Sequence, residues 1–276
     1  MLSFYKFHTD KDQINILIYS DKPSFFIEIL PPTVQYCIID TQQINDWKGP
    51  LNYIYRLKTK VLQAVCATYT GNFLFVDTDT VFLKNSAIIF KEIEARELFL
   101  DTNEGKLVAN KGGIAKKIKR FLKKQDTFSI PSDANAITLT DQFVVWNSGI
   151  IGFTNAIQKT LMSVEELMDL LYVKSKIFTV EQIALSYYFQ KINQPKETKD
   201  FIYHYWDFKE FRIILKAFFD HNKSKKIVEL INEIHKINPQ TLAIPKRNYK
   251  KLTFIQKQWR KLSTGSKWKI PFYSLD

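Results

Sequence analysis

The segment NFLFVDTDTVF (residues 72–82) sets the expected architecture and directs the search for a site. Its apolar residues 73–76 form a run whose length and composition predict a short buried strand. Asp77 and Asp79 follow at the end of that strand. Sheets of α/β proteins bind ligands at strand ends, and two carboxylates offer the oxygen atoms that Mg²⁺ or Mn²⁺ prefers. The segment therefore predicts a metal site, with a simple strand-ending turn as the alternative.

Strands and helices alternate on both sides of this segment. The apolar positions of Leu51–Tyr69 recur with a helical period, and the apolar runs Ile14–Tyr19 and Val34–Ile39 are typical of strands. Further along the chain, Phe143–Trp146 and Ile150–Phe153 are also typical of strands. This alternation predicts an α/β fold with a mostly parallel sheet and helices on both faces.

The chain has 276 residues, 45% of them hydrophobic, which is enough for one large domain with a small appendage. We expect residues 1–206 to form the main domain and residues 207–276 a helical, basic appendage. Cys37 and Cys66 lie in apolar stretches, which favours buried free thiols and a reducing, cytoplasmic environment over a disulfide. No apolar run approaches the roughly 20 residues that span a bilayer, and residues 1–12 lack a signal-peptide pattern.

The net charge is +12, and basic residues gather in two segments, Lys111–Lys124 and Lys246–Lys269. The second segment contains no acidic residue. Such segments suit nucleic acid, an anionic membrane surface or a phosphorylated substrate, and a solvated basic face is the alternative. Nucleic acid is the least favoured partner, because the segments lack an interleaved aromatic platform and zinc-finger spacing.

The second basic segment also contains an amphipathic pattern. Residues 248–262 place Leu252, Ile255, Trp259 and Leu262 on one helical face, with basic residues around it. Docking of this face onto the rest of the protein is the preferred interpretation. Peripheral binding at the anionic inner surface of a membrane is the alternative.

Five motifs occur in a fixed order along residues 51–206. They are a helix with Arg56, Lys58 and Lys60, then Asp77-Thr78-Asp79, Asn147-Ser148-Gly149, Glu181-Gln182 and His204. In order and approximate spacing they resemble the motifs of glycosyltransferases of the GT-A fold, and most closely the glycogenin-type, family 8 retaining enzymes. The resemblance implies a Rossmann-like, three-layer α/β fold with a mixed, mostly parallel sheet and a helical C-terminal appendage.

The resemblance also implies roles for these residues. Asp77, Asp79 and His204 would hold Mn²⁺ or Mg²⁺, which would bind the diphosphate of a nucleotide sugar, with UDP as the usual nucleotide. Lys60, or Arg56 one turn earlier, would face the diphosphate or the donor sugar. The turn Asn147-Ser148-Gly149 would line the sugars, with Thr78 and Asp141 also at the substrate. A saccharide, a lipid-linked saccharide or a protein could be the acceptor. The same residues could instead serve as surface charges, a packed histidine or a tight turn.

Glu181 and Gln182 have a local explanation as well as an implied catalytic one. Thr179 precedes Gln182 by three residues, a spacing that predicts a capping box at a helix start. The family usually has Asp-Gln here, so Glu181 would carry its carboxylate more than about 1 Å further, a distance that matters in a catalytic site. The set of expected catalytic residues is Glu181, Gln182, Lys60 and Asn147.

Two alternatives to a glycosyltransferase remain open from the sequence. One is a protein that binds or processes nucleic acid, based on the charge and the carboxylate pair. The other is a non-catalytic member of the GT-A fold. Two features favour it. Glu181 stands where the family usually has Asp, and the first strand of the family's nucleotide-binding region has no counterpart at the start of this sequence.

Overall fold

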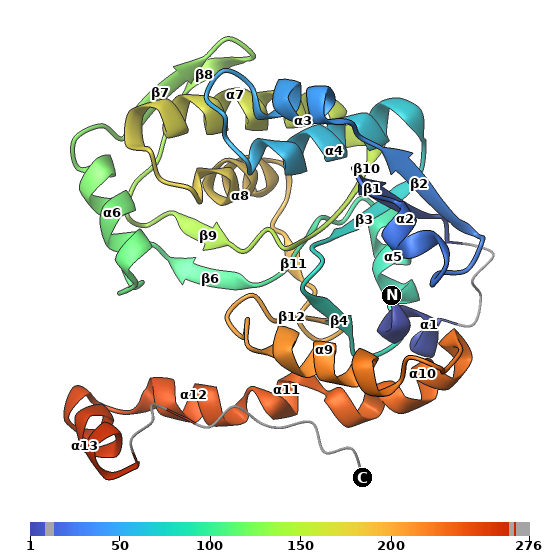
Figure 1. Ribbon diagram of the computed structural model, residues 1–276. Helices are drawn as coiled ribbons and strands as arrows, with labels where there is room; N and C mark the ends of the chain where they lie inside the picture. Colours follow the sequence, from blue (N-terminus) through green and yellow to red (C-terminus); the bar gives the residue numbers. More distant parts are fainter. Residues whose placement is uncertain (9–13, 265–267, 269–276) are drawn as a thin grey trace. The chain divides into compact units, whose positions relative to one another are not determined.

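The computed structural model describes residues 1–8, 14–264 and 268, and its secondary structure is mixed α/β (Figure 1). The chain forms two compact units, each discontinuous in sequence. The sheet unit comprises Asn15–Asp77 and Ser86–Asp200. The helical unit comprises Met1–Ile14, Thr78–Asn85 and Phe201–Asp276. A single boundary after Trp206 was expected, and the two-domain description based on it stays a prediction.

The sheet unit contains most of the strands. Its strands are β1 (Ile16–Ser20), β2 (Val34–Ile38), β3 (Asn72–Val76), β5 (Phe99–Leu100), β6 (Asn103–Lys106), β7 (Thr127–Ile130), β8 (Asp133–Thr138), β9 (Val144–Trp146), β10 (Ile150–Thr154) and β11 (Lys196–Glu197). Its helices are α2 (Ser24–Ile27), α3 (Thr41–Lys48), α4 (Arg56–Thr68), α5 (Ala87–Glu94), α6 (Gly113–Leu122), the 3-10 turn η2 (Asn155–Ile157), α7 (Gln158–Ser175) and α8 (Val180–Ile192).

The central sheet of this unit has the strand order β11-β5-β10-β3. β10 runs antiparallel to both β3 and β5, whereas β11 runs parallel to β5. The parallel pair β1–β2 and the antiparallel pairs β6–β9 and β7–β8 form separate small sheets. The mixed α/β class is confirmed. The prediction of a mostly parallel sheet is wrong for the described residues, since β10 runs antiparallel to both of its neighbours. The apolar run of β10 predicted a strand but could not predict its direction.

Helices α4, α5, α7 and α8 bury the apolar faces that their sequences present. In α7 the buried residues Leu161, Val164, Leu167, Met168 and Leu171 recur with a helical period. α5 packs against β3 and β10, and α7 packs against both α4 and α8. One continuous apolar core results, and it includes residues from α4, β10, α7 and α8.

The helical unit has its own core. Its elements are α1 (Leu2–Phe7), β4 (Thr80–Phe82), β12 (Ile202–His204), α9 (Phe211–His221), α10 (Ile227–Glu233), the 3-10 turn η3 (Ile234–Ile237), α11 (Pro239–Leu242), α12 (Ile244–Lys251) and α13 (Phe254–Thr264). Leu2 from α1 packs with Phe208, Phe211 and Phe218 near and within α9. The short antiparallel pair β4–β12 belongs to this unit. The helical C-terminal region is therefore confirmed.

Two further expectations concern the cysteines and the membrane. Cys66 is buried, Cys37 is half-buried, and both thiols are free. Burial raises the pKa of the Cys66 thiol to about 11. Within the described ranges, no helix combines the length and the apolar character needed to cross a bilayer.

Candidate metal centre

The position of Asp77 follows from the pairing of β3 with β10. Val76, the last residue of β3, lies opposite Ile150, the first residue of β10. The Asp77 backbone N–H continues this ladder by donating a 2.7 Å hydrogen bond to the Gly149 carbonyl. The pairing therefore brings the turn Asn147-Ser148-Gly149 next to the first carboxylate of the Asp-x-Asp motif.

The position of Asp79 relative to His204 follows from the β4–β12 pair. Thr80 lies opposite His204, and the Tyr205 N–H donates to the Asp79 carbonyl at 2.9 Å. His204 Nε2 lies 3.1 Å from Asp79 Oδ1, and the His204 side chain is only 6% exposed. The hydrogen bond with His204 holds the pKa of Asp79 below its ordinary value. A slip of one residue in this pairing would turn His204 to the opposite face.

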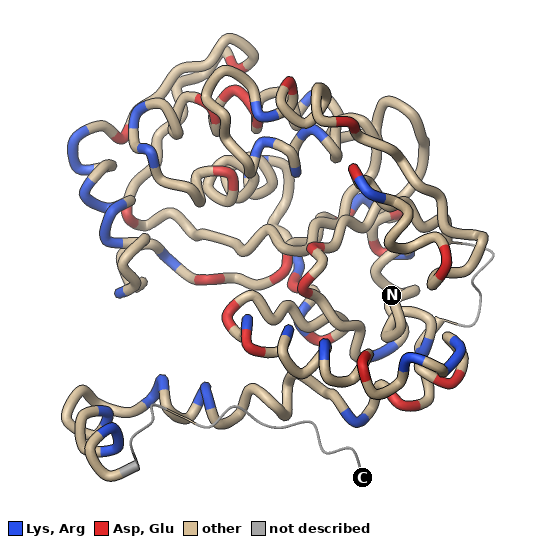
Figure 2. The backbone as a smooth tube through the Cα atoms, viewed as in Figure 1, with Lys and Arg blue, Asp and Glu red and all other residues tan. Residues whose placement is uncertain are grey.

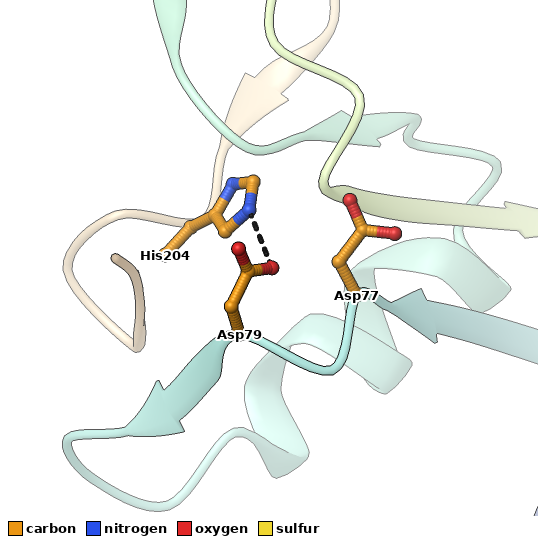
Figure 3. A group of neighbouring side chains, drawn as sticks. All are labelled: Asp77, Asp79 and His204. Carbon is orange, nitrogen blue, oxygen red and sulfur yellow. Dashed lines mark hydrogen bonds and ion pairs between the residues drawn. The ribbon is translucent and has the colours of Figure 1, made fainter. Parts of the chain in front are cut away.

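Asp77, Asp79 and His204 together form a group that could hold a metal ion; we call it the acid–histidine group (Figure 3). Each offers one ligand atom, and these atoms all lie within 4.8 Å of one another. One residue separates the two aspartates in the chain, so their proximity is a local property of the backbone.

The donor set of the acid–histidine group fits the expected ions. In a six-coordinate site with bonds of about 2.1 Å, neighbouring ligand atoms lie about 3 Å apart and opposite ones about 4.2 Å apart. The 3.1 Å between His204 Nε2 and Asp79 Oδ1 matches the spacing of neighbouring ligands. Carboxylates suit Mg²⁺ and Mn²⁺ alike, whereas imidazole favours transition metals, so the set fits Mn²⁺ better than Mg²⁺.

A buried lysine network adjoins Asp77 on the side of the sheet unit; it consists of Lys58, Asp77, Ser148 and Glu181. Lys58 Nζ lies 3.1 Å from Asp77 Oδ2 and donates a 2.9 Å hydrogen bond to the Ser148 carbonyl. It also lies 3.6 Å from Glu181 Oε1. Burial alone would lower the pKa of Lys58, but the carboxylates of Glu181 and Asp77 outweigh burial and raise it. Lys58 is therefore a fixed positive charge beside Asp77.

Glu181 is the most deeply buried member of this network, with 1% of its surface exposed. Its Oε1 accepts a 2.8 Å hydrogen bond from the Ser148 hydroxyl. Burial raises the pKa of Glu181, while Lys58 and Ser148 oppose that rise. α8 begins at Val180, but its N-cap residue Thr179 makes no side-chain capping hydrogen bond. The expected capping box is therefore wrong, and Gln182 lies half-buried on the first turn of α8.

The turn before β10 is held by its own side chain and by a neighbouring strand. Asn147 Oδ1 accepts a 2.9 Å hydrogen bond from the Gly149 N–H, and Asn147 Nδ2 donates to Glu104 Oε1 at 3.2 Å. Asn147 and Ser148 are buried, at 5% and 2% exposure. Glu104 is an exposed acid on β6 that the sequence did not single out.

Of the four other expected site residues, Thr78 stands between Asp77 and Asp79 in the chain, whereas Arg56 and Lys60 contact α7. Lys60 Nζ lies 2.7 Å from Glu165 of α7. Arg56 pairs with Glu165 and, at 3.1 Å, with Asp169. These two basic side chains therefore join α4 to α7. Thr78 and Asp141 are exposed.

Lys58 lies beside Asp77, whereas Lys60, which we expect to face the diphosphate or the donor sugar, contacts Glu165. The two residues are two positions apart, which is about 200° around a helix, so they point to opposite sides of α4. The helical period of the buried positions in α4 was the sequence signal that could have pointed to Lys58 instead of Lys60. Lys58 lies one residue before the buried Thr59 and four before the buried Leu62, and the side chain at position 58 is only 11% exposed.

The chain matches no protein-family model, no curated protein sequence and no solved structure. The assignment of a function accordingly depends on the chemistry of the residues described above.

Proposed function

We propose that this protein is a metal-dependent glycosyltransferase of the GT-A fold that uses a nucleotide-diphosphate sugar, with UDP as the first nucleotide to test. The observation that carries the proposal is the acid–histidine group, whose two aspartates directly follow the half-buried strand β3. Its two carboxylates and one imidazole match the ligand set that the sequence resemblance implies for a diphosphate-bound metal. The sugar and the acceptor, whether a saccharide, a lipid-linked saccharide or a protein, stay open.

Asp77, Asp79 and His204 would hold Mn²⁺ or Mg²⁺. A bound ion would supply Lewis-acid stabilisation of the negative charge that develops on the leaving diphosphate. Lys58 would keep the Asp77 carboxylate oriented through its 3.1 Å contact, and its own charge favours an anionic ligand nearby. This role replaces the one expected for Lys60, which is engaged by Glu165.

Glu181 and the turn at residues 147–149 would shape the sugar side of the site. Glu181 contacts both Ser148 and Lys58, so its carboxylate fixes the turn relative to the cation. The extra methylene of Glu compared with Asp would allow this bridge. Retention of the anomeric configuration is the outcome that the family resemblance implies, with Gln182 and Asn147 as the neighbouring polar groups.

A nucleotide panel tests the proposal directly. Thermal unfolding is followed with UDP, GDP, CMP and their sugars, with and without Mn²⁺, and with a short oligonucleotide. A ligand at about 100 times its dissociation constant adds roughly 2.7 kcal/mol of stability. We expect manganese-dependent stabilisation by one nucleotide and its sugar. Stabilisation by the oligonucleotide alone would favour the nucleic-acid alternative, and nucleotide binding without turnover would favour a non-catalytic protein.

Variants of the acid–histidine group test the metal site without any substrate. Asp79→Asn and His204→Ala should each weaken Mn²⁺ binding at least tenfold, or about 1.4 kcal/mol, in a calorimetric titration. Asp79→Asn should also abolish metal-dependent turnover of the donor. Asp46→Asn and His235→Ala change exposed residues of the same types and serve as controls. Unchanged Mn²⁺ affinity in both site variants would refute the metal site.

A further inference from the structure

Helix α13 turns its apolar face outward. Ile255, Trp259 and Leu262 are 71%, 72% and 86% exposed, and Phe254 at the start of the helix is 74% exposed. A helix that packs on a protein core shows the opposite arrangement, with the apolar face buried and the polar face exposed. The sequence led us to prefer docking of this face onto the rest of the protein, and the exposures contradict that interpretation.

The polar face of α13 is the better covered side. Ile255, Trp259 and Leu262 fall within about 60° of one another around the helix, whereas Lys257 and Arg260 lie on the opposite side. Lys257 and Arg260 are half-buried. Lys257 Nζ donates a 3.0 Å hydrogen bond to the Lys250 carbonyl of α12 and lies 5.7 Å from the centre of the Tyr249 ring. The chain thus holds α13 by its basic side.

The charge around this exposed face has one sign. No acidic residue occurs between Lys246 and Lys269, and Lys and Arg alone mark the charged positions along α12 and α13 (Figure 2). Lys246 and Lys250 of α12 pair with Glu210 and Asp207, at 2.5 Å and 2.7 Å. Other basic residues of the segment, including Arg247, Lys251 and Lys261, are exposed.

From these observations we infer that α13 is a peripheral anchor that inserts Ile255, Trp259 and Leu262 into the surface of an anionic lipid bilayer. A basic amphipathic helix lies in the interfacial plane, with its apolar side among the acyl chains and its cations at the anionic headgroups. Trp259 suits this depth, because its ring combines apolar area with one polar N–H. Nucleic acid would satisfy the charge but would leave the apolar face in water.

Vesicle sedimentation of the full chain tests the anchor. Vesicles of phosphatidylcholine mixed with anionic phosphatidylglycerol are compared with vesicles of phosphatidylcholine alone. We expect binding to the anionic vesicles at least tenfold stronger than to the neutral ones. Raising the salt from about 0.1 M to about 1 M shortens the Debye length from about 10 Å to about 3 Å and should remove most of this preference. Absence of sedimentation with either vesicle would overturn the inference.

A matched pair of triple variants separates insertion from general surface stickiness. Ile255→Ser/Trp259→Ser/Leu262→Ser should lower the partition coefficient about 100-fold, because it removes the inserted area. The control, Ile213→Ser/Phe219→Ser/Val228→Ser, removes exposed apolar residues from α9 and α10 and should leave binding unchanged. Because all six positions are exposed, we expect neither variant to lose stability. Unchanged melting temperatures verify that both variants fold.

Two outcomes would contradict the anchor even if the protein sediments with vesicles. Equal loss of binding in both triple variants would show that any exposed apolar area suffices. Self-association that disappears only in the α13 variant, measured by analytical ultracentrifugation without lipid, would assign the face to a second copy of the chain. Quenching of Trp fluorescence by brominated lipids should occur in the unchanged protein and fall markedly in Trp259→Phe.

Discussion

Lys58 shows how one side chain can fix the geometry next to Asp77. Its ammonium group contacts the Asp77 carboxylate, the Ser148 carbonyl and, at 3.6 Å, the Glu181 carboxylate. These three partners follow β3, precede β10 and begin α8. The side chain of Lys58 also passes the Phe75 ring, with Nζ 5.4 Å from the ring centre. A single cation therefore links three elements of the sheet unit.

We expect Lys58→Met to destabilise the sheet unit by about 3 kcal/mol. Removal of one partner of a buried ion pair leaves the other charge uncompensated, and Glu181 is almost fully buried. Lys91→Met, an exposed lysine on α5, is the control and should change stability by less than about 0.5 kcal/mol. Urea denaturation measures both.

The double variant Lys58→Met/Glu181→Gln identifies the cause. It should be more stable than the sum of its single variants predicts, because the uncompensated carboxylate is gone. Additive losses would mean that Lys58 contributes packing and not charge compensation.

Residue-level prediction from the sequence succeeded where a single backbone segment decides the geometry. Asp77 and Asp79 lie one residue apart at a strand end, so their grouping could be predicted. The choice between Lys58 and Lys60 depends on the rotation of α4 about its axis, which tertiary packing against α7 determines. The relation of His204 to Asp79 depends on the register of β12 against β4, which involves residues more than 100 positions apart.

At the level of elements, β10 is an inner strand of the central sheet. It lies between β3 and β5, and its residues Ile150, Ile151 and Phe153 are fully buried. At Gly152 an added Cβ would lie 2.9 Å from Phe99 Cβ and 3.0 Å from Ile93 Cδ1. Phe99 Cβ is fixed to its strand and cannot move away easily. Glycine is therefore required here by the closeness of β5 and α5 and not by its own backbone conformation.

Gly152→Ala should destabilise the protein by about 1–3 kcal/mol, the usual cost of overpacking a close-packed core. Gly113→Ala is the matched control. No atom lies within 4 Å of an added Cβ at Gly113, which is in the first turn of α6. That substitution should raise stability by about 0.4–1 kcal/mol, because it restricts the unfolded chain. Equal effects of both substitutions in urea denaturation would contradict this account of β10.

Glu233 at the end of α10 gives the helical unit a defined response to acid. Lys236 and Lys225 lie 2.7 Å and 3.0 Å from its carboxylate oxygens and lower the pKa of Glu233 to about 2. A carboxylate with a lowered pKa contributes stability above its unfolded pKa of about 4.3 and loses that contribution as the pH falls toward 2. The expected window is therefore about pH 4.3 to pH 2.

Glu233→Gln should lower the melting temperature at pH 7 and converge with the unchanged protein near pH 2. The comparison needs melting curves at several pH values across the window. Glu94→Gln, at an exposed position on α5, controls for general loss of negative charge. A difference between Glu233→Gln and the unchanged protein that persists undiminished at pH 2 would show that the ion pairs are not its source. High salt should reduce the effect at pH 7.

Element types were predictable where the apolar pattern is strong. The helix expected over Leu51–Tyr69 corresponds to α4, and the strands around residues 72–76 and 150–154 are present. Strand direction was not predictable, because an apolar run such as that of β10 is the same when read in either direction. The two-residue strand β11 depends on its neighbour β5 for pairing and carries little signal of its own.

At the scale of the whole chain, the two units divide the sequence in an unexpected way. The boundary between them falls at the peptide bond between Asp77 and Thr78, inside the Asp-x-Asp motif. The segment Thr78–Asn85 joins the helical unit because β4 pairs with β12, and Phe82 N donates to the Ser3 hydroxyl at 3.0 Å. Composition alone suggests a single boundary. Units built from segments that are separate in sequence have no linker between them that a composition change would reveal.

This division predicts opposite results for two truncations. A chain that ends at Trp206 loses Phe208, Phe211, Ile214, Phe218, Leu230 and Ile237, six large buried residues of the helical core. At about 1.5–3 kcal/mol each, their burial amounts to roughly 9–18 kcal/mol, which is comparable to the net stability of about 5–15 kcal/mol of a typical domain. A chain that ends at Thr253 keeps these residues and, among the described residues of that core and its edge, loses the partly buried Trp268 alone.

Hydrogen exchange at β4 distinguishes the two truncations, because β4 is far in sequence from both cuts. The amides of Thr80–Phe82 should exchange at least a hundredfold faster in the chain that ends at Trp206, since loss of the core frees the β4–β12 pair. In the chain that ends at Thr253 their protection should stay within a few-fold of the full chain, as should Mn²⁺ affinity. Full protection of β4 after truncation at Trp206 would mean that residues 1–206 form an independent domain. Loss of protection in the chain that ends at Trp206, but not in the chain that ends at Thr253, would establish that the β4–β12 pair depends on the C-terminal helices. Asp79 directly precedes β4, and His204 is on β12.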